Sequence, residues 1–124
     1  MYMLLAIGAG GALGSVARYL LATQLGQWFG SGFPWGTLAV NVLGGIAMGA
    51  LAQGLPQSAA PELRAFLAIG VLGGFTTFSA FSLDVVHLAE RGEMLAAAGY
   101  VGASVILSVL GLLLGMAVIR ATLA

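Results

Sequence analysis

The chain has 124 residues, of which 60% are hydrophobic and only 6% are charged, and its formal net charge is zero. Soluble domains carry about 25% charged residues and nucleic-acid-binding domains need a basic face, so this chain, which has no lysine, fits neither class. The absence of cysteine excludes disulfides, thiolate nucleophiles and cysteine-based metal sites.

Four apolar segments follow in chain order, and each is about 20 residues or longer, enough to cross a hydrocarbon core of about 30 Å. We expect transmembrane helices at residues 3–21, 35–55, 63–88 and 94–119. A polar, glycine-rich link through Gly26, Gly30 and Pro34 follows the first segment. The first segment lacks a basic start and a clear cleavage site, so we expect a retained helix rather than a signal peptide. The prediction is a single all-α transmembrane domain over residues 1–124.

Glycine pairs spaced four residues apart occur in every predicted helix: Gly10/Gly14, Gly45/Gly49, Gly70/Gly74 and Gly111/Gly115. In lipid such pairs let two helix backbones approach closely. The alternative for the first cluster is a dinucleotide-binding turn, which needs a preceding strand and an acidic residue downstream in a βαβ unit. Neither is available in a membrane-spanning helix, so we interpret the glycines as packing residues.

The third predicted helix contains the sequence Gly-Gly-Phe-Thr-Thr-Phe-Ser-Ala-Phe-Ser at residues 73–82. Irregular backbone in a membrane persists only where it is buried in protein or lines a watery path. The segment therefore predicts a helix broken near mid-membrane, with carbonyl groups exposed to an ion. The alternative is a packing kink whose hydroxyl groups bond back to their own helix.

The polar residues within the predicted helices are almost all neutral. No Asp, Glu or Lys lies deep in any helix, whereas proton-coupled carriers generally need an intramembrane carboxylate; Asp84 and His87 lie toward the end of the third helix. Amide and hydroxyl groups can donate hydrogen bonds to an anion without trapping it by a fixed charge. The neutral donors are Asn41, Thr76, Thr77, Ser79, Ser82, Tyr100, Ser104 and Ser108, of which the last three form one stripe along a helix. Taken alone, each of these residues also has an ordinary structural explanation: its hydroxyl group can bond to a carbonyl of its own helix, or its side chain can form a hydrogen bond to another helix.

Phe78 and Phe81 lie one turn apart among these hydroxyl groups. An aromatic ring has a positive edge that can face a small anion. By residue statistics alone such a pair is more often a packing contact, so these two residues do not by themselves indicate an anion site.

The positions of the four arginines indicate how the chain is oriented across the membrane. With four helices both termini lie on one side, which carries Arg64 and Arg120, and the other side carries Arg91 and, if it reaches the interface, Arg18. The excess of Lys and Arg in short loops sets orientation, and here the count is two against two. We therefore expect insertion in both orientations and an antiparallel homodimer; the alternative is that another feature fixes the topology.

Three signatures in this order resemble the CrcB/Fluc family of fluoride channels, and the resemblance covers almost the whole chain. They are Gly10-Gly11-x-x-Gly14-x-x-x-Arg18-Tyr19, Gly36-Thr37-Leu38-x-x-Asn41-x-x-Gly44, and the segment at residues 73–82. The stripe of Tyr100, Ser104 and Ser108 also fits. One departure is Ala80, where the family often has threonine.

The resemblance implies an antiparallel, dual-topology homodimer in a bacterial-type cytoplasmic membrane, with two parallel fluoride pathways. It implies that Asn41, Phe78 and Phe81 line each pathway beside a polar track, and that Arg18 lies toward a vestibule. It also implies a structural sodium ion at the dimer interface, held by the backbone carbonyls of Gly73 and Thr76. The residues assigned to the polar track are Thr77, Tyr100, Ser104 and Ser108, and Ser79 and Thr37 complete the candidate pathway.

Two other functions remain open. A small multidrug-type, proton-coupled exporter shares the size, the helix count and the dual topology, but it needs a carboxylate in the first helix, whose only charge here is Arg18. A non-transporting membrane subunit would use the glycines for assembly alone. An enzyme is not indicated, because no nucleophile–base pair or metal cluster is present.

Overall fold

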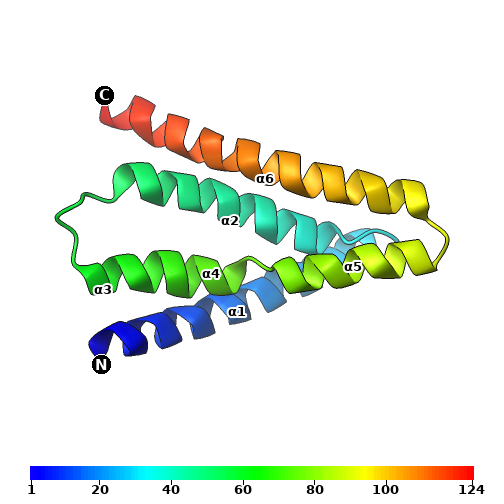
Figure 1. Ribbon diagram of the computed structural model, residues 1–124, viewed down its shortest axis with the longest axis horizontal. Coiled ribbons are helices and arrows are strands. Elements are labelled where there is room, and N and C mark those ends of the chain that lie inside the picture. Colours follow the sequence, from blue (N-terminus) through cyan, green and yellow to red (C-terminus); the bar gives the residue numbers. More distant parts are fainter.

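The computed structural model describes residues 1–124 and is helical throughout (Figure 1). Four helical segments are long and apolar enough to cross a membrane, which confirms the predicted multi-pass membrane protein. Helices α1 and α6 have 28 and 30 residues and α2 has 20, so even α2 is about 30 Å long. The four segments are α1 (Tyr2–Phe29), α2 (Trp35–Gly54), the third span (Pro61–Glu90) and α6 (Met94–Leu123).

Helix α1 continues eight residues beyond the predicted end at residue 21, and the expected link through Gly26 is wrong. Gly26 lies inside the helix, where its carbonyl accepts a hydrogen bond from the backbone N–H of Gly30. The helix ends at Gly30, whose φ of 83° lies in the left-handed region that favours glycine. The real link is therefore the short stretch from Gly30 to Pro34.

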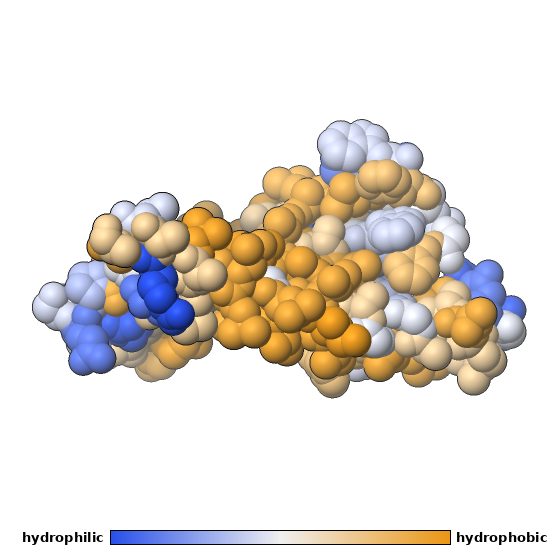
Figure 2. Space-filling view, turned by 90° about the horizontal axis from the view of Figure 1, so that it is seen from above, coloured by the Kyte–Doolittle hydropathy of each residue, from blue (hydrophilic) through white to orange (hydrophobic).

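Both termini and the α2–α3 loop lie at one end of the molecule, and the two other connections lie at the opposite end (Figure 1). The surface between the ends is a broad apolar zone with hydrophilic residues toward either end (Figure 2). Only 16 of the 124 residues are buried, so most apolar side chains face outward, as expected for a chain that lies in lipid.

Two close helix pairs make up the molecule: α2 packs along α6, and α1 packs along the third span. All eight glycines of the predicted pairs lie at helix contacts: a Cβ atom would overlap a neighbouring helix at seven of them and would be tightly packed at Gly111. At Gly49 the obstacle is the Leu112 carbonyl, and at Gly115 it is the Ile46 carbonyl. This confirms the packing role of the glycine pairs.

The third span changes its backbone geometry four times. It contains α3 (Pro61–Arg64), the π-helix η1 (Ala65–Val71), α4 (Leu72–Phe75) and α5 (Phe78–Glu90). Between α4 and α5 the backbone is extended, with φ −85° and ψ 156° at Thr76 and φ −150° and ψ 120° at Thr77. Helical hydrogen bonding therefore stops at Thr76 and Thr77, which lie within the predicted segment at residues 73–82.

Candidate functional site

Asn41 of α2 binds the extended backbone of Thr77 through both ends of its side-chain amide. The Thr77 N–H donates to Asn41 Oδ1 over 2.8 Å, and Asn41 Nδ2 donates to the Thr77 carbonyl over 3.1 Å. In a continuous helix the Thr77 N–H would instead donate to the carbonyl of Gly73. The pairing thus removes the helical donor of the Gly73 carbonyl.

Thr77 also begins α5 as its N-cap residue. Its Oγ1 accepts a hydrogen bond from the Ala80 N–H over 3.0 Å, which satisfies one of the free donors of a helix start. A continuous helix would pair the Ala80 N–H with the carbonyl of Thr76. The cap therefore leaves the Thr76 carbonyl without its helical donor, and no other backbone group donates to the carbonyls of Gly73, Phe75 or Thr76.

The extended stretch at Thr76 and Thr77, between α4 and α5, is the interruption of the third span. Arg18 of α1 contacts the backbone beside this interruption from the other side. Its Nε donates to the carbonyl of Gly74 over 3.0 Å, and the side chain is partly buried. The structure thus places Arg18 against α4 within its span; its predicted position toward a vestibule stays a prediction.

The hydroxyl groups near the interruption divide into two kinds. Thr76 Oγ1 donates to the Leu72 carbonyl over 2.9 Å and Ser82 Oγ to the Phe78 carbonyl over 2.8 Å, so these two bond back to their own helices. Ser79 Oγ lies 3.4 Å from Thr77 Oγ1. The hydroxyl groups of Thr77 and Ser79 therefore lie together at the start of α5.

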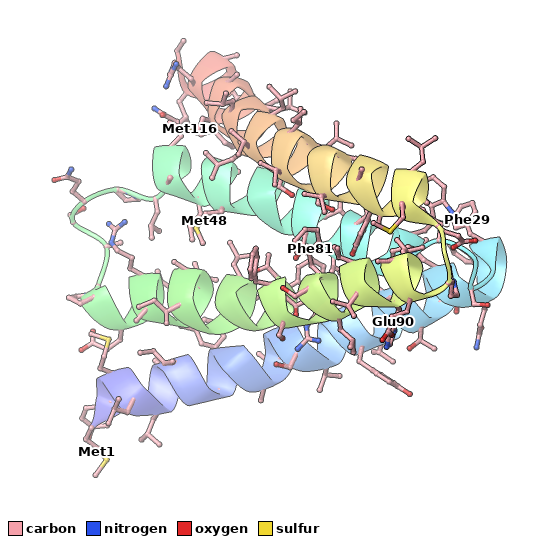
Figure 3. All side chains as sticks on the ribbon, turned by 45° about the vertical axis from the view of Figure 1, so that its right-hand side comes forward. Met1, Phe29, Met48, Phe81, Glu90 and Met116 are labelled. Carbon is pink, nitrogen blue, oxygen red and sulfur yellow. The ribbon has the colours of Figure 1, made fainter.

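Three aromatic rings form a row from α5 to α6. The ring centroids of Phe78 and Phe81 are 5.4 Å apart, and those of Phe81 and Tyr100 are 5.2 Å apart. Phe81 is 8% exposed and packs in the core beside Tyr100, toward the α2–α6 pair (Figure 3), whereas Phe78 is 78% exposed. The two phenylalanines thus occupy different surroundings in a single subunit.

The predicted polar stripe of α6 faces the rest of the subunit. Tyr100 is completely buried, and its hydroxyl donates to Asp84 Oδ2 over 3.0 Å. Ser104 is 6% exposed, and its Oγ has no hydrogen-bond partner. A buried hydroxyl group without a partner is rare in proteins. Ser104 Oγ is therefore free to donate a hydrogen bond to a bound ion or molecule, or to accept one from it.

A cleft of about 450 Å³ brings seven of the predicted residues together. Its other walls are mainly apolar and come from α2 and α6, and Met48 points into it from α2 (Figure 3). The predicted residues that line it are Asn41, Thr76, Thr77, Phe78, Phe81, Ser104 and Ser108. Arg18, Gly73, Ser79 and Tyr100 are not among its lining residues.

A second cavity, of about 260 Å³, lies near the link between α1 and α2. Thr37, Asp84, His87 and Arg91 line it. Through its hydrogen bond to Tyr100, Asp84 connects this cavity to the polar stripe. The sequence alone gave no role to Asp84, although it is the one carboxylate within the third predicted span and lies three residues after Phe81.

The remaining charged residues lie at the ends of the molecule. Arg91 pairs with Glu93 at 2.7 Å and also donates to the Gly32 carbonyl. Arg64 and Arg120 donate to Pro56 and Gln53, near the termini. No group of three or more His, Asp or Glu side chains lies close enough to bind a metal ion.

Residues 5–116 match the family described as CrcB-like protein, Camphor Resistance (CrcB). A protein of Rhodospirillum centenum is 60% identical over the full length of both chains. Proteins of Nitrobacter winogradskyi and Rhizobium meliloti are each 51% identical, over 94% and 98% of both chains respectively. All three relatives are named fluoride-specific ion channel FluC. The predicted family is thereby confirmed: the chain belongs to the CrcB-like family.

Proposed function

We propose that this chain is the subunit of a fluoride-selective channel that lets fluoride cross the membrane passively. The observation that carries the proposal is the cleft in which Asn41, the two phenylalanines and the unpartnered Ser104 hydroxyl meet. The names of relatives that are 51–60% identical over nearly the whole chain support the same function.

The chemistry of the cleft suits a small anion. Its polar groups are amides and hydroxyls, which donate hydrogen bonds but carry no charge that would hold the ion permanently. The edges of Phe78 and Phe81 add positive partial charge without a competing counter-ion. The proton-coupled exporter lacks support, because α1 contains no acidic residue and Asp84 accepts a hydrogen bond from Tyr100.

We further propose that two subunits assemble antiparallel and bind a sodium ion between them. The carbonyls of Gly73 and Thr76 fit this role, because both have lost their helical donors and a hard cation binds carbonyl oxygen. The sodium ion would supply a fixed positive charge that joins the two interrupted spans. Exposed Gly73 and Phe78 would then lie at or near the partner.

In the bacterial cytoplasmic membrane that we propose as its location, the channel would protect the cell by expelling fluoride. A negative interior favours the exit of each anion by about 2.3 kcal/mol per 100 mV. No chemical reaction or external energy source is needed.

Efflux from liposomes that contain only the purified chain tests the function. We expect fluoride efflux that far exceeds chloride efflux and continues when a protonophore collapses any proton gradient. Protein-free liposomes of the same lipid are the control. Efflux that requires a proton gradient would instead identify an exporter, and no fluoride efflux at all would support a non-transporting subunit.

A further inference from the structure

We propose that Asn41 and Arg18 are positioning residues for the cation site. They hold the third span in its interrupted form from two sides, and they determine which of its carbonyls remain free. This inference rests on the sodium site proposed above. It gives Asn41 a second role, distinct from donating a hydrogen bond to the permeating anion.

The Asn41 side chain pairs with Thr77 as a neighbouring strand would. In an extended residue the N–H and C=O point to the same side, and Asn41 bonds both groups of Thr77. In a helical residue these two groups point in opposite directions along the axis. The pairing and a continuous helix through Thr77 therefore exclude each other, so Asn41 holds the interruption open.

Arg18 acts on the carbonyl next to Gly73. The end of the helical run from Pro61 to Phe75 carries negative partial charge on its unpaired carbonyls, and the guanidinium group binds one of them, at Gly74. Because the Gly74 carbonyl accepts this hydrogen bond, it is not available as a cation ligand. The contact also ties α1 to α4 at the position where the Gly74 backbone lies against Gly11.

The Asn41 pairing and the Thr77 cap together make the free carbonyls of Gly73 and Thr76 possible. An unpaired carbonyl costs several kcal/mol inside a membrane, so a lone span would close into a continuous helix. Without Asn41, the Thr77 N–H can return to the Gly73 carbonyl. Without the Thr77 hydroxyl, the Ala80 N–H can return to the Thr76 carbonyl. Each loss removes a cation ligand while the backbone stays fully hydrogen-bonded.

Thermal unfolding of the purified full-length chain in detergent tests this, with sodium chloride titrated against N-methylglucamine chloride. We expect sodium to raise the melting temperature of the wild-type protein. In Asn41→Ala the sodium concentration at half-effect should rise about tenfold, which corresponds to about 1.4 kcal/mol of binding free energy. Thr122→Ala is the control, because Thr122 lies in the last turn of α6 and its hydroxyl donates to the Ile119 carbonyl; its sodium midpoint should stay at the wild-type value.

A second pair of variants decides the question if Asn41→Ala does not fold. Thr77→Val keeps the branched shape but removes the cap, whereas Thr77→Ser keeps the hydroxyl. The sodium midpoint should rise in Thr77→Val and stay near wild type in Thr77→Ser. Equal midpoints in the wild type, Thr77→Val and every folded Asn41 variant would overturn the inference.

Comparison with the liposome assay separates this inference from the proposed function. A wild-type protein that sodium stabilises, with the expected shifts in the variants, but that passes no fluoride would refute the channel and leave the positioning role standing. A wild-type protein that passes fluoride selectively but gains no stability from sodium would refute the positioning role alone.

Discussion

The two phenylalanines of the third span are not equivalent. Phe81 belongs to the core and packs against Tyr100, whereas Phe78 is largely exposed in a single subunit. A substitution at Phe81 therefore changes packing and ring chemistry together. A substitution at Phe78 mainly removes the ring, so Phe78 is the better position for testing whether a ring edge meets the anion.

Phe78→Met should reduce fluoride efflux sharply while leaving the melting temperature close to wild type. An aliphatic side chain has no positive edge to offset the lost hydration of the anion, and a near-volume-conserving apolar change costs less than about 1.5 kcal/mol. Efflux and melting temperature of the same preparation measure both effects. Phe78→Tyr, which keeps the ring, is the control, and wild-type efflux from Phe78→Met would make Phe78 a packing residue.

Ser104→Ala should lower fluoride efflux without lowering stability. The buried Ser104 hydroxyl has no partner, and such a group costs about 1–3 kcal/mol, so its removal should leave the melting temperature unchanged or higher. If the hydroxyl donates to the permeating ion, efflux should nevertheless fall. A Ser104→Ala protein with undiminished efflux would show that this part of the stripe does not meet fluoride.

The contacts between the predicted site residues could not be read from the sequence. Most of the predicted residues surround one cleft, because helix periodicity and the glycine contacts turn them toward it. The bonds from Asn41 to Thr77 and from Tyr100 to Asp84 join residues 36 and 16 positions apart. Such pairings depend on how the helices meet in space, which no local pattern specifies.

At the scale of helices, the close contact between α2 and α6 depends on glycine. Gly115→Ala should destabilise the protein by about 1–3 kcal/mol, because its new methyl group would overlap the Ile46 carbonyl and force the backbones apart. Gly99→Ala is the matched control in the same helix, since nothing lies within 4 Å of its added Cβ atom. Melting temperatures in detergent compare the two, and an equal response would refute the packing argument.

The four spans could be predicted because membrane helices carry a strong length and hydropathy signal. Two features of the helices could not. The extension of α1 to Phe29 passes through Gly26 and polar residues that also suit a loop. The π-helix at Ala65–Val71 differs from an α-helix only in its hydrogen-bond partners, and its apolar sequence fits both.

At the scale of the whole molecule, the distribution of arginines bears on orientation. Arg64 and Arg120 lie near the termini and Arg91 lies at the opposite end. Because Arg18 is held against Gly74, the loops carry two arginines against one rather than the expected two against two. A difference of one charge is a small bias under the rule that sets orientation.

Adding three arginines after Ala124 should fix one orientation and abolish most fluoride efflux, if the active form is antiparallel. Co-expression with a chain that carries three arginines beside Gly92, at the opposite end, should restore efflux. Each chain expressed alone is the control, and efflux from cells or vesicles is the measurement. Full efflux from a single fixed orientation would indicate a parallel dimer or a monomer.

The two residues that hold the third span lie earlier in the chain than the span itself. Arg18 and Asn41 belong to α1 and α2, and they bind Gly74 and Thr77. During synthesis the first two helices therefore enter the bilayer before the segment that needs them has been made. When the third span follows, its backbone at Gly74 and Thr77 can bind Arg18 and Asn41, which are already in the membrane. The order of helices along the chain thus gives the Gly74 carbonyl and both backbone groups of Thr77 their partners as soon as the third span inserts.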